Sequence, residues 1–137
     1  NITSEIIQSV ASNTKEYTIF NLQDAIGVKD KAKAFQIAFN LLENEEILKI
    51  IGSLNKYFMN LAQIPEMIQK KVPDELMAKK LSTHPFYLRN YKEARKLYSD
   101  RKLNHIAKAL LEADLSVKTS ATDEKTILTK LLTEIFN

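Results

Sequence analysis

The sequence predicts an all-α protein, a helical bundle of about six to seven helices. Only 2 of the 137 residues are glycine and 3 are proline, so few positions favour turns or interrupt helices. Apolar residues make up 45% of the chain and recur at steps of three and four residues, the period of a helix with one buried face. No segment shows the apolar–polar alternation of a strand. A chain of this length and composition can bury the core of a single domain.

The apolar period predicts where each helix lies, and the capping residues on either side predict where it begins and ends. After a short helix at 3–12, the segments expected to be helical are 18–27, 31–43, 45–62, 74–82, 85–98, 100–118 and 123–136. Four of them follow a short polar side chain that can accept a hydrogen bond from a first-turn N–H: Thr18, Asp30, Ser99 and Thr122. Gly27 is expected to end its helix in the left-handed conformation, which glycine adopts without a steric penalty.

The strongest apolar period lies in 45–62, and it predicts a helix seam buried in a bundle. The residues of this seam are Ile47, Ile51, Leu54, Phe58 and Leu61. The other expected stripes are Phe35, Ala38, Phe39 and Leu42, then Leu103, Ala107, Leu110 and Val117, and last Ile127 or Leu128, Leu131 and Ile135. Gly52 lies off the seam, where either a neighbouring helix packs closely or a glycine is tolerated. Pro65 is expected to bend or end this helix, and Pro73 to begin the next.

Segment 85–98 predicts an amphipathic helix with two contrasting faces. One face carries Tyr87, Tyr91, Ala94 and Tyr98, and the opposite face carries Arg89, Lys92 and Lys96. The tyrosines are more typical of a core edge whose hydroxyls reach water than of a platform on which bases stack. The basic side chains could meet an acidic neighbour, nucleic acid or only water.

Asp114 falls on the apolar stripe one turn after Leu110, so its carboxylate needs a partner. Lys118, one turn further on, is the nearest candidate, and a backbone group of a neighbouring element is the other. A general acid or base paired with a histidine is the catalytic alternative. Because no second carboxylate or histidine lies beside Asp114 in the sequence, we favour the structural role.

Composition argues against several kinds of site. Gly27 and Gly52 stand too far apart for a phosphate-binding loop, which needs glycines at fixed offsets. The chain has no cysteine, so it has no thiolate nucleophile and no cysteine-based metal site. His84 and His105 have no neighbouring histidine at metal-ligand spacing. We therefore expect no catalytic residue, no metal and no cofactor, and no apolar run approaches the roughly 20 residues that span a bilayer.

Charge is concentrated in the middle of the chain. Residues 63–111 hold 11 basic and 5 acidic side chains, whereas the whole chain has a net charge of +3. A solvated basic face is the commonest explanation of such a zone. The alternative is a freestanding basic helical domain that binds nucleic acid.

Three segments, in order, resemble those of one protein family. IFNLQDAIGVKDKAKAFQIAFNLL at 19–42 resembles its Phe-x-Leu-x-x-Ala-Ile helix followed by an acid-capped helix that ends in a Leu-Leu pair. LSTHPFYLRNYKEARKLYS at 81–99 resembles its region around His-Pro-Phe. LNHIAKALLEADLSVKT at 103–119 is similar to its closing signature, although Ser120 replaces the usual glycine. The matching positions of that signature are Glu112, Ala113, Asp114, Lys118 and Thr119. The family is the C-terminal part of the delta subunit of bacterial DNA polymerase III, a clamp-loader subunit.

The resemblance implies a domain organisation. Residues 1–14 would be the tail of a preceding lid domain, and 15–137 a helical collar domain that serves oligomerisation. A chain that opens on Asn1 is expected to be a piece of a longer protein, without the N-terminal module that grips the sliding clamp.

The resemblance also implies a non-catalytic assembly function, and the absence of cysteine fits a reducing cytoplasm. The expected partners are the collar domains of the gamma or tau and delta-prime subunits in a five-membered ring of the DNA polymerase III holoenzyme, with DNA reached only through the full complex. The candidate interface residues are of two kinds. Tyr57, Met59 and Phe86 are large residues that lie outside the predicted apolar stripes, and Arg89, Lys92 and Lys96 form the basic face.

Overall fold

A computed structural model describes residues 17–137, and this part of the chain folds as a helical bundle without strands. Its elements are α2 (Ile19–Gly27), α3 (Lys31–Leu42), α4 (Ile47–Gln69), α5 (Asp74–Lys80), the 3₁₀ turn η1 (Pro85–Tyr87), α6 (Leu88–Leu97), α7 (Asp100–Thr119) and α8 (Glu124–Phe136). The predicted all-α fold is therefore confirmed. The helix expected at 3–12 and the lid tail expected at 1–14 lie outside the described residues.

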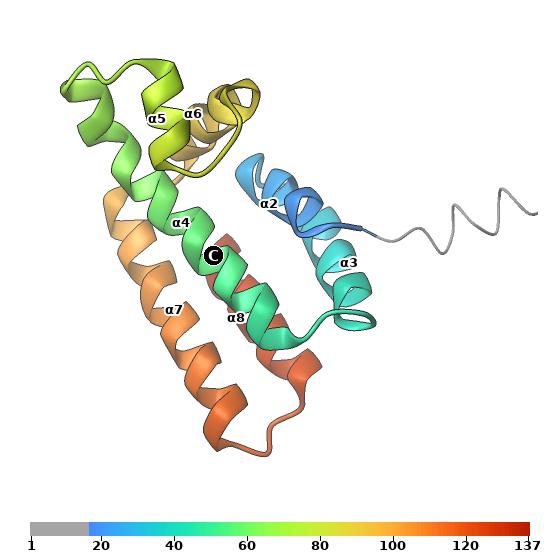
Figure 1. Ribbon diagram of the computed structural model, residues 1–137. Helices are drawn as coiled ribbons and strands as arrows, with labels where there is room; N and C mark the ends of the chain where they lie inside the picture. The colour runs from blue at the N-terminus through green and yellow to red at the C-terminus, as the bar shows by residue number, and fades with distance from the viewer. Residues whose placement is uncertain (1–16) are drawn as a thin grey trace, which may run out of the picture.

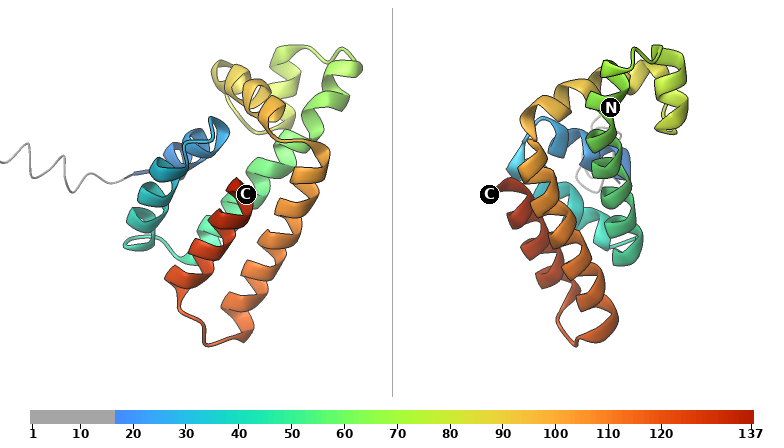
Figure 2. Two further views of the ribbon diagram at one scale, coloured as in Figure 1. Left: turned by 180° about the vertical axis from the view of Figure 1, so that it is seen from behind. Right: turned by 90° about the vertical axis from the view of Figure 1, so that its left-hand side faces the viewer.

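The long helix α4 runs through the centre of the bundle (Figure 1). Helix α7 packs along one side of it, and α8 packs against both α7 and α3. The pair α2 and α3 closes the other side, while α5, η1 and α6 gather at one end of α4 (Figure 2). At this end of the bundle α6 contacts both α2 and α4.

Helix α4 confirms the predicted seam, since all five seam residues are buried. The helix does not end at Pro65 but continues to Gln69. Proline removes one backbone hydrogen bond from a helix interior, yet the buried side chains of Ile64 and Met67 on either side hold the last turn against the bundle. At Gly52 an added Cβ would meet nothing within 4 Å, so the glycine is tolerated on an open surface.

Three of the four predicted N-caps are confirmed. Thr18 accepts from the Asn21 N–H in a capping box, Asp30 accepts from the Lys33 N–H, and Ser99 accepts from the Lys102 N–H. The cap of α8 is wrong by one residue, because the Asp123 carboxylate accepts from the Thr126 N–H at 3.2 Å. The helix then begins at Glu124, and Thr122 stays outside it.

The predicted stripes of α3 and α7 are only partly correct, because each helix packs against two neighbours rather than one. In α3 the fully buried residues are Ala34, Ile37, Ala38 and Leu41. Phe35 and Phe39 are half-buried, and Phe35 reaches the Phe136 ring at 6.5 Å between centroids. In α7 the buried set is Leu103, Ile106, Ala109, Leu110 and Ala113, whereas Ala107 is exposed. The stripe of α8 is confirmed, with both Ile127 and Leu128 buried.

A buried hydrogen bond joins α2 to the end of α6. Tyr98 is 0% exposed, and its Oη donates to the backbone oxygen of Ile26 at 2.6 Å. The expectation that this tyrosine reaches water is therefore wrong. The adjacent Gly27 is not left-handed either, because Lys29, with φ 59°, takes that conformation two residues later. Gly27 is needed for space: an added Cβ would lie 2.7 Å from Tyr57 Oη and 3.3 Å from Ala94 Cβ.

The two glycines give a matched test of this account. Gly52→Ala should raise the free energy of unfolding by up to about 1 kcal/mol, since alanine is the better helix former and the space is open. Gly27→Ala should lower it by about 1 kcal/mol or more, because overpacking outweighs the gain in helix propensity. Urea denaturation of both variants measures the difference. Equal effects at the two positions would contradict the steric role of Gly27.

Tyr98→Phe should cost about 1 kcal/mol of stability at neutral pH, the ordinary worth of one hydrogen bond. Burial also raises the pKa of the Tyr98 phenol above its ordinary value of 10.0. Above about pH 10 the unfolded chain therefore releases a proton that the folded chain keeps, and the free energy of unfolding falls by up to about 1.4 kcal/mol per pH unit for this group. Denaturation curves from pH 8 to 11 should show a shallower fall for Tyr98→Phe. An unchanged slope would mean that the phenol is not buried in solution.

Candidate interaction surface

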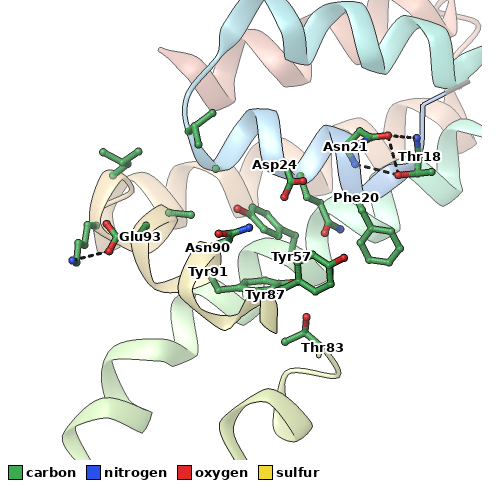
Figure 3. A pocket seen from close by; sticks show the side chains of 16 residues that line it. Thr18, Phe20, Asn21, Asp24, Tyr57, Thr83, Tyr87, Asn90, Tyr91 and Glu93 are labelled. Atoms are coloured by element: carbon green, nitrogen blue, oxygen red, sulfur yellow. Dashed lines mark hydrogen bonds and ion pairs between the residues drawn. The ribbon is translucent and has the colours of Figure 1, made fainter. Parts of the chain in front are cut away.

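Exposed apolar side chains gather around a groove between α2 and α6. Four large ones line it: Phe20 at 72% exposure, Val28 at 71%, Tyr87 at 49% and Leu97 at 48%. Phe20 and Val28 belong to the α2 side, and Tyr87 and Leu97 to the η1–α6 side. Figure 3 labels Phe20 and Tyr87 among the side chains that line the groove. The cavity between the walls has a volume of about 800 Å³. A concave apolar surface of this kind is typical of a binding site rather than of ordinary exposed residues.

The floor of the groove is made where α2, α4 and α6 meet. Tyr57 of α4 rises between the two walls, and its ring is only 5% exposed. Tyr91 packs on it with 5.4 Å between ring centroids. Because Gly27 and Ala94 are small, α2 and α6 can approach each other closely beside the Tyr57 hydroxyl. This close approach closes the bottom of the groove.

The polar groups of the groove leave one carboxylate without a partner. Asp24 lines the groove, and in the described part of the chain its carboxylate makes no hydrogen bond or ion pair. Partial burial raises the pKa of this carboxyl above its usual value. The other acid, Glu93, is paired with Lys96 at 3.3 Å. Asn21 is held in the capping box with Thr18, and Asn90 of α6 lies across from Asp24.

The predicted interface residues do not form one surface. Tyr57 is buried in the groove floor, so the expectation that it lies outside the intramolecular packing is wrong. Phe86 is 78% exposed and packs edge-on against Tyr87 at the mouth of the groove, with 5.5 Å between centroids. Met59 is 57% exposed, on another face of α4. An interface role for these residues stays a prediction.

The basic face lies on the other side of α6, over a hollow of about 830 Å³ next to the end of α4. Arg89, Lys92 and Lys96 all line it, as predicted from their spacing. However, Lys92 pairs with Asp74 at 3.1 Å and Lys96 with Glu93. These pairs reduce the positive charge of this face, so nothing in its geometry favours the nucleic-acid alternative.

Asp114 has the partner that the sequence predicts, since Lys118 Nζ lies 2.8 Å from its carboxylate. The Asp114 side chain is 33% exposed, so the pair sits at the edge of the seam and not inside it.

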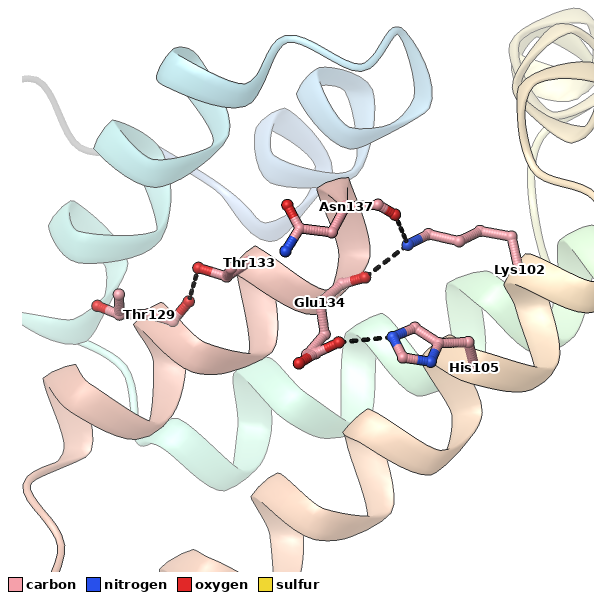
Figure 4. Close-up of polar contacts among 6 residues, drawn as sticks. All are labelled: Lys102, His105, Thr129, Thr133, Glu134 and Asn137. Carbon is pink, nitrogen blue, oxygen red and sulfur yellow. Dashed lines mark hydrogen bonds and ion pairs between the residues drawn. The ribbon is translucent and has the colours of Figure 1, made fainter.

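His105 and Lys102 are engaged in contacts between α7 and α8 that the sequence does not reveal. His105 Nε2 lies 2.6 Å from a carboxylate oxygen of Glu134, and Lys102 Nζ donates to the backbone oxygens of Glu134, at 2.7 Å, and Asn137 (Figure 4). The lysine thus neutralises the carbonyl end of α8. Both contacts hold α8 against α7.

Within residues 17–137 no group of three or more histidine, aspartate or glutamate side chains is placed to hold a metal ion. None of the helices in the same range is both long and apolar enough to cross a membrane.

The groove residues that sequence reasoning missed are Phe20, Val28, Asp24 and Leu97. The three apolar ones are not among the buried residues of α2 and α6. A large apolar residue off the apolar stripe of its helix is the signal that could have found them, whereas Asp24 carries no such signal. Only the tertiary contact between α2 and α6 shows that the four belong to one surface.

Comparisons with known proteins agree with this architecture. The family "DNA polymerase III delta subunit, C-terminal domain" matches residues 16–135. A curated relative, DNA polymerase III subunit delta of Bacillus subtilis, is 25% identical over 135 residues, which are 98% of this chain and 39% of the relative. The solved structure of the DNA clamp loader delta protein of Bacillus subtilis superposes with a TM-score of 0.71 at 26% identity, over 86% of this chain and 35% of that one.

The described part of the chain is thus an all-α domain that carries an exposed apolar groove on one face. The chain belongs to the family of C-terminal domains of the DNA polymerase III delta subunit. It spans less than half the length of the relatives that it matches.

Replacing Asp114 tests its structural role. Asp114→Asn should lower the free energy of unfolding by only about 0.3–0.5 kcal/mol, because an exposed pair at i and i+4 contributes little. The loss should shrink as salt is added, since screening weakens the pair in the parent as well. Urea denaturation at 50 mM and 500 mM salt measures both. A loss of several kcal/mol would instead indicate a buried carboxylate with a further partner.

Proposed function

We propose that this chain is a non-catalytic assembly module of the bacterial clamp loader, the C-terminal part of its delta subunit. It would hold delta in the pentameric ring that loads the sliding clamp during DNA replication. Membership of the delta C-terminal family is the observation that carries this proposal. The apolar groove between α2 and α6 supports it, because a domain that works by assembly needs an exposed surface that a partner can cover.

The proposed partners are the collar domains of the gamma or tau subunits and of delta-prime. A ring of different subunits uses heterologous contacts, so each member presents two different faces to its two neighbours. The apolar groove on one side of α6 and the basic face on its other side meet this requirement. DNA would be reached only through the assembled complex, and the sliding clamp would be bound by the N-terminal module of delta.

The same proposal includes the domain boundaries, the parent assembly and the cellular location. Residues 15–137 would be the collar domain and 1–14 the tail of the lid domain. The parent assembly would be the DNA polymerase III holoenzyme in the cytoplasm. The residues of this domain would take no part in nucleotide hydrolysis or in polymerisation.

Co-assembly with the partner domains tests the proposal. The chain should co-elute from a size-exclusion column with purified gamma or tau collar domains and with the delta-prime collar domain of the same organism, at micromolar concentration. An unrelated helical bundle of similar size and charge serves as the control. Separate elution from both partners at that concentration would count against the assembly role.

A further inference from the structure

We propose that the α2–α6 groove binds an amphipathic helix of a neighbouring clamp-loader subunit, with a lysine or arginine of that helix beside Asp24. This inference rests on the proposed function. It deepens that function by naming the surface through which the chain is held and the chemistry that recognises it.

The apolar part of the groove favours a protein segment over a small ligand. Phe20 and Val28 on one rim and Tyr87 and Leu97 on the other are each about half to three-quarters exposed, so apolar surface extends well beyond the cavity itself. A small molecule in the cavity would leave these rims in water. A protein segment long enough to pass along both rims would cover them, and large aromatic and aliphatic side chains around a hollow are typical of the residues that dominate binding energy.

The shape of the groove favours a helix. Its walls are two helices, α2 and α6, and its floor is a side chain of a third, α4. A helix laid between them would place side chains at i, i+3 or i+4, and i+7 along the rims, which is how amphipathic helices bind in hydrophobic grooves. Tyr57 in the floor and Ala94 at the base of the α6 wall are buried without the ligand, so the groove is already formed in the free domain.

Charge identifies the remaining feature of the ligand. The Asp24 carboxylate makes no ion pair or hydrogen bond in the described chain, whereas Glu93 is already paired with Lys96, which also lines the groove. Covering the groove with a purely apolar surface would strip water from the Asp24 carboxylate without compensation. A cation on the ligand would offset part of that cost, provided that hydrogen bonds complete the pair. An anionic ligand such as nucleic acid would instead add repulsion at the same place.

A second exposed apolar patch supplies matched controls. Leu111 and Leu115 on α7 are 61% and 49% exposed, close to the values for the rim residues of the groove, but they line none of its walls. Leu115→Asp therefore matches Leu97→Asp in residue type, exposure and helical setting. Glu112→Lys, also on α7, matches the charge reversal Asp24→Lys.

The experiment measures the affinity of the 137-residue chain, by titration calorimetry, for the purified gamma or tau collar domain and for the delta-prime collar domain separately. Leu97→Asp, Phe20→Ala and Asp24→Lys should each weaken binding to one of the two partners by about tenfold or more. The affinity of these variants for the other partner should stay within about twofold of the parent. The affinities of the control variants Leu115→Asp and Glu112→Lys for both partners should also stay within about twofold.

Circular dichroism and thermal melting of each variant establish that it is folded. Phe20 is 72% exposed, so Phe20→Ala keeps the test valid if Leu97→Asp unfolds.

Three results would overturn the inference. If the parent binds a partner but folded groove variants bind it equally well, the groove is not the interface and the proposed function still stands. If sedimentation shows that the parent self-associates, and Leu97→Asp abolishes this without changing either partner affinity, the ligand is a second copy of the chain. If the parent binds neither partner, both the inference and the proposed function fail.

Discussion

The arrangement of this domain depends on the contact between α2 and the end of α6. The buried Tyr98 hydroxyl donates to the Ile26 oxygen, and the missing side chain at Gly27 lets Tyr57 and Ala94 lie directly against α2. These contacts fix the distance between the two helices at their closest point. From there α2 and α6 form the walls of a groove, so one hydrogen bond and one small residue help to set the shape of this apolar surface.

The polar contacts of the remaining helices are mostly structural. Lys102 and His105 attach α8 to α7, the Asp114–Lys118 pair lies along α7, and side-chain caps begin α2, α3, α7 and α8. These groups are satisfied by one another, so each serves to hold the helices together. Asp24 differs from them, since its carboxylate lies in the groove with no partner in the described chain. The groove is therefore the part of the described surface where a polar group is left for a ligand.

Sequence alone was sufficient wherever structure is decided within one helix. The caps at Thr18, Asp30 and Ser99 and the seam of α4 follow from local hydrogen bonding and the helical period, and they were predicted correctly. Gly27 and Tyr98 were misinterpreted because their roles arise from residues far along the chain: Tyr98 bonds across 72 positions. The groove was missed for the same reason. Phe20 and Leu97 are unremarkable surface residues in their own helices and form one site only when α2 packs against α6.

The position of Tyr57 joins the groove to the centre of the core. Helix α4 has 23 residues, is about 35 Å long at 1.5 Å per residue, and touches α2, α6 and α7 along its length. Its Tyr57 forms the groove floor, while its buried residues from Ile47 to Met67 pack it against the rest of the core. A close-packed core has low compressibility, so the groove floor is expected to be rigid and to keep its depth when a ligand covers it.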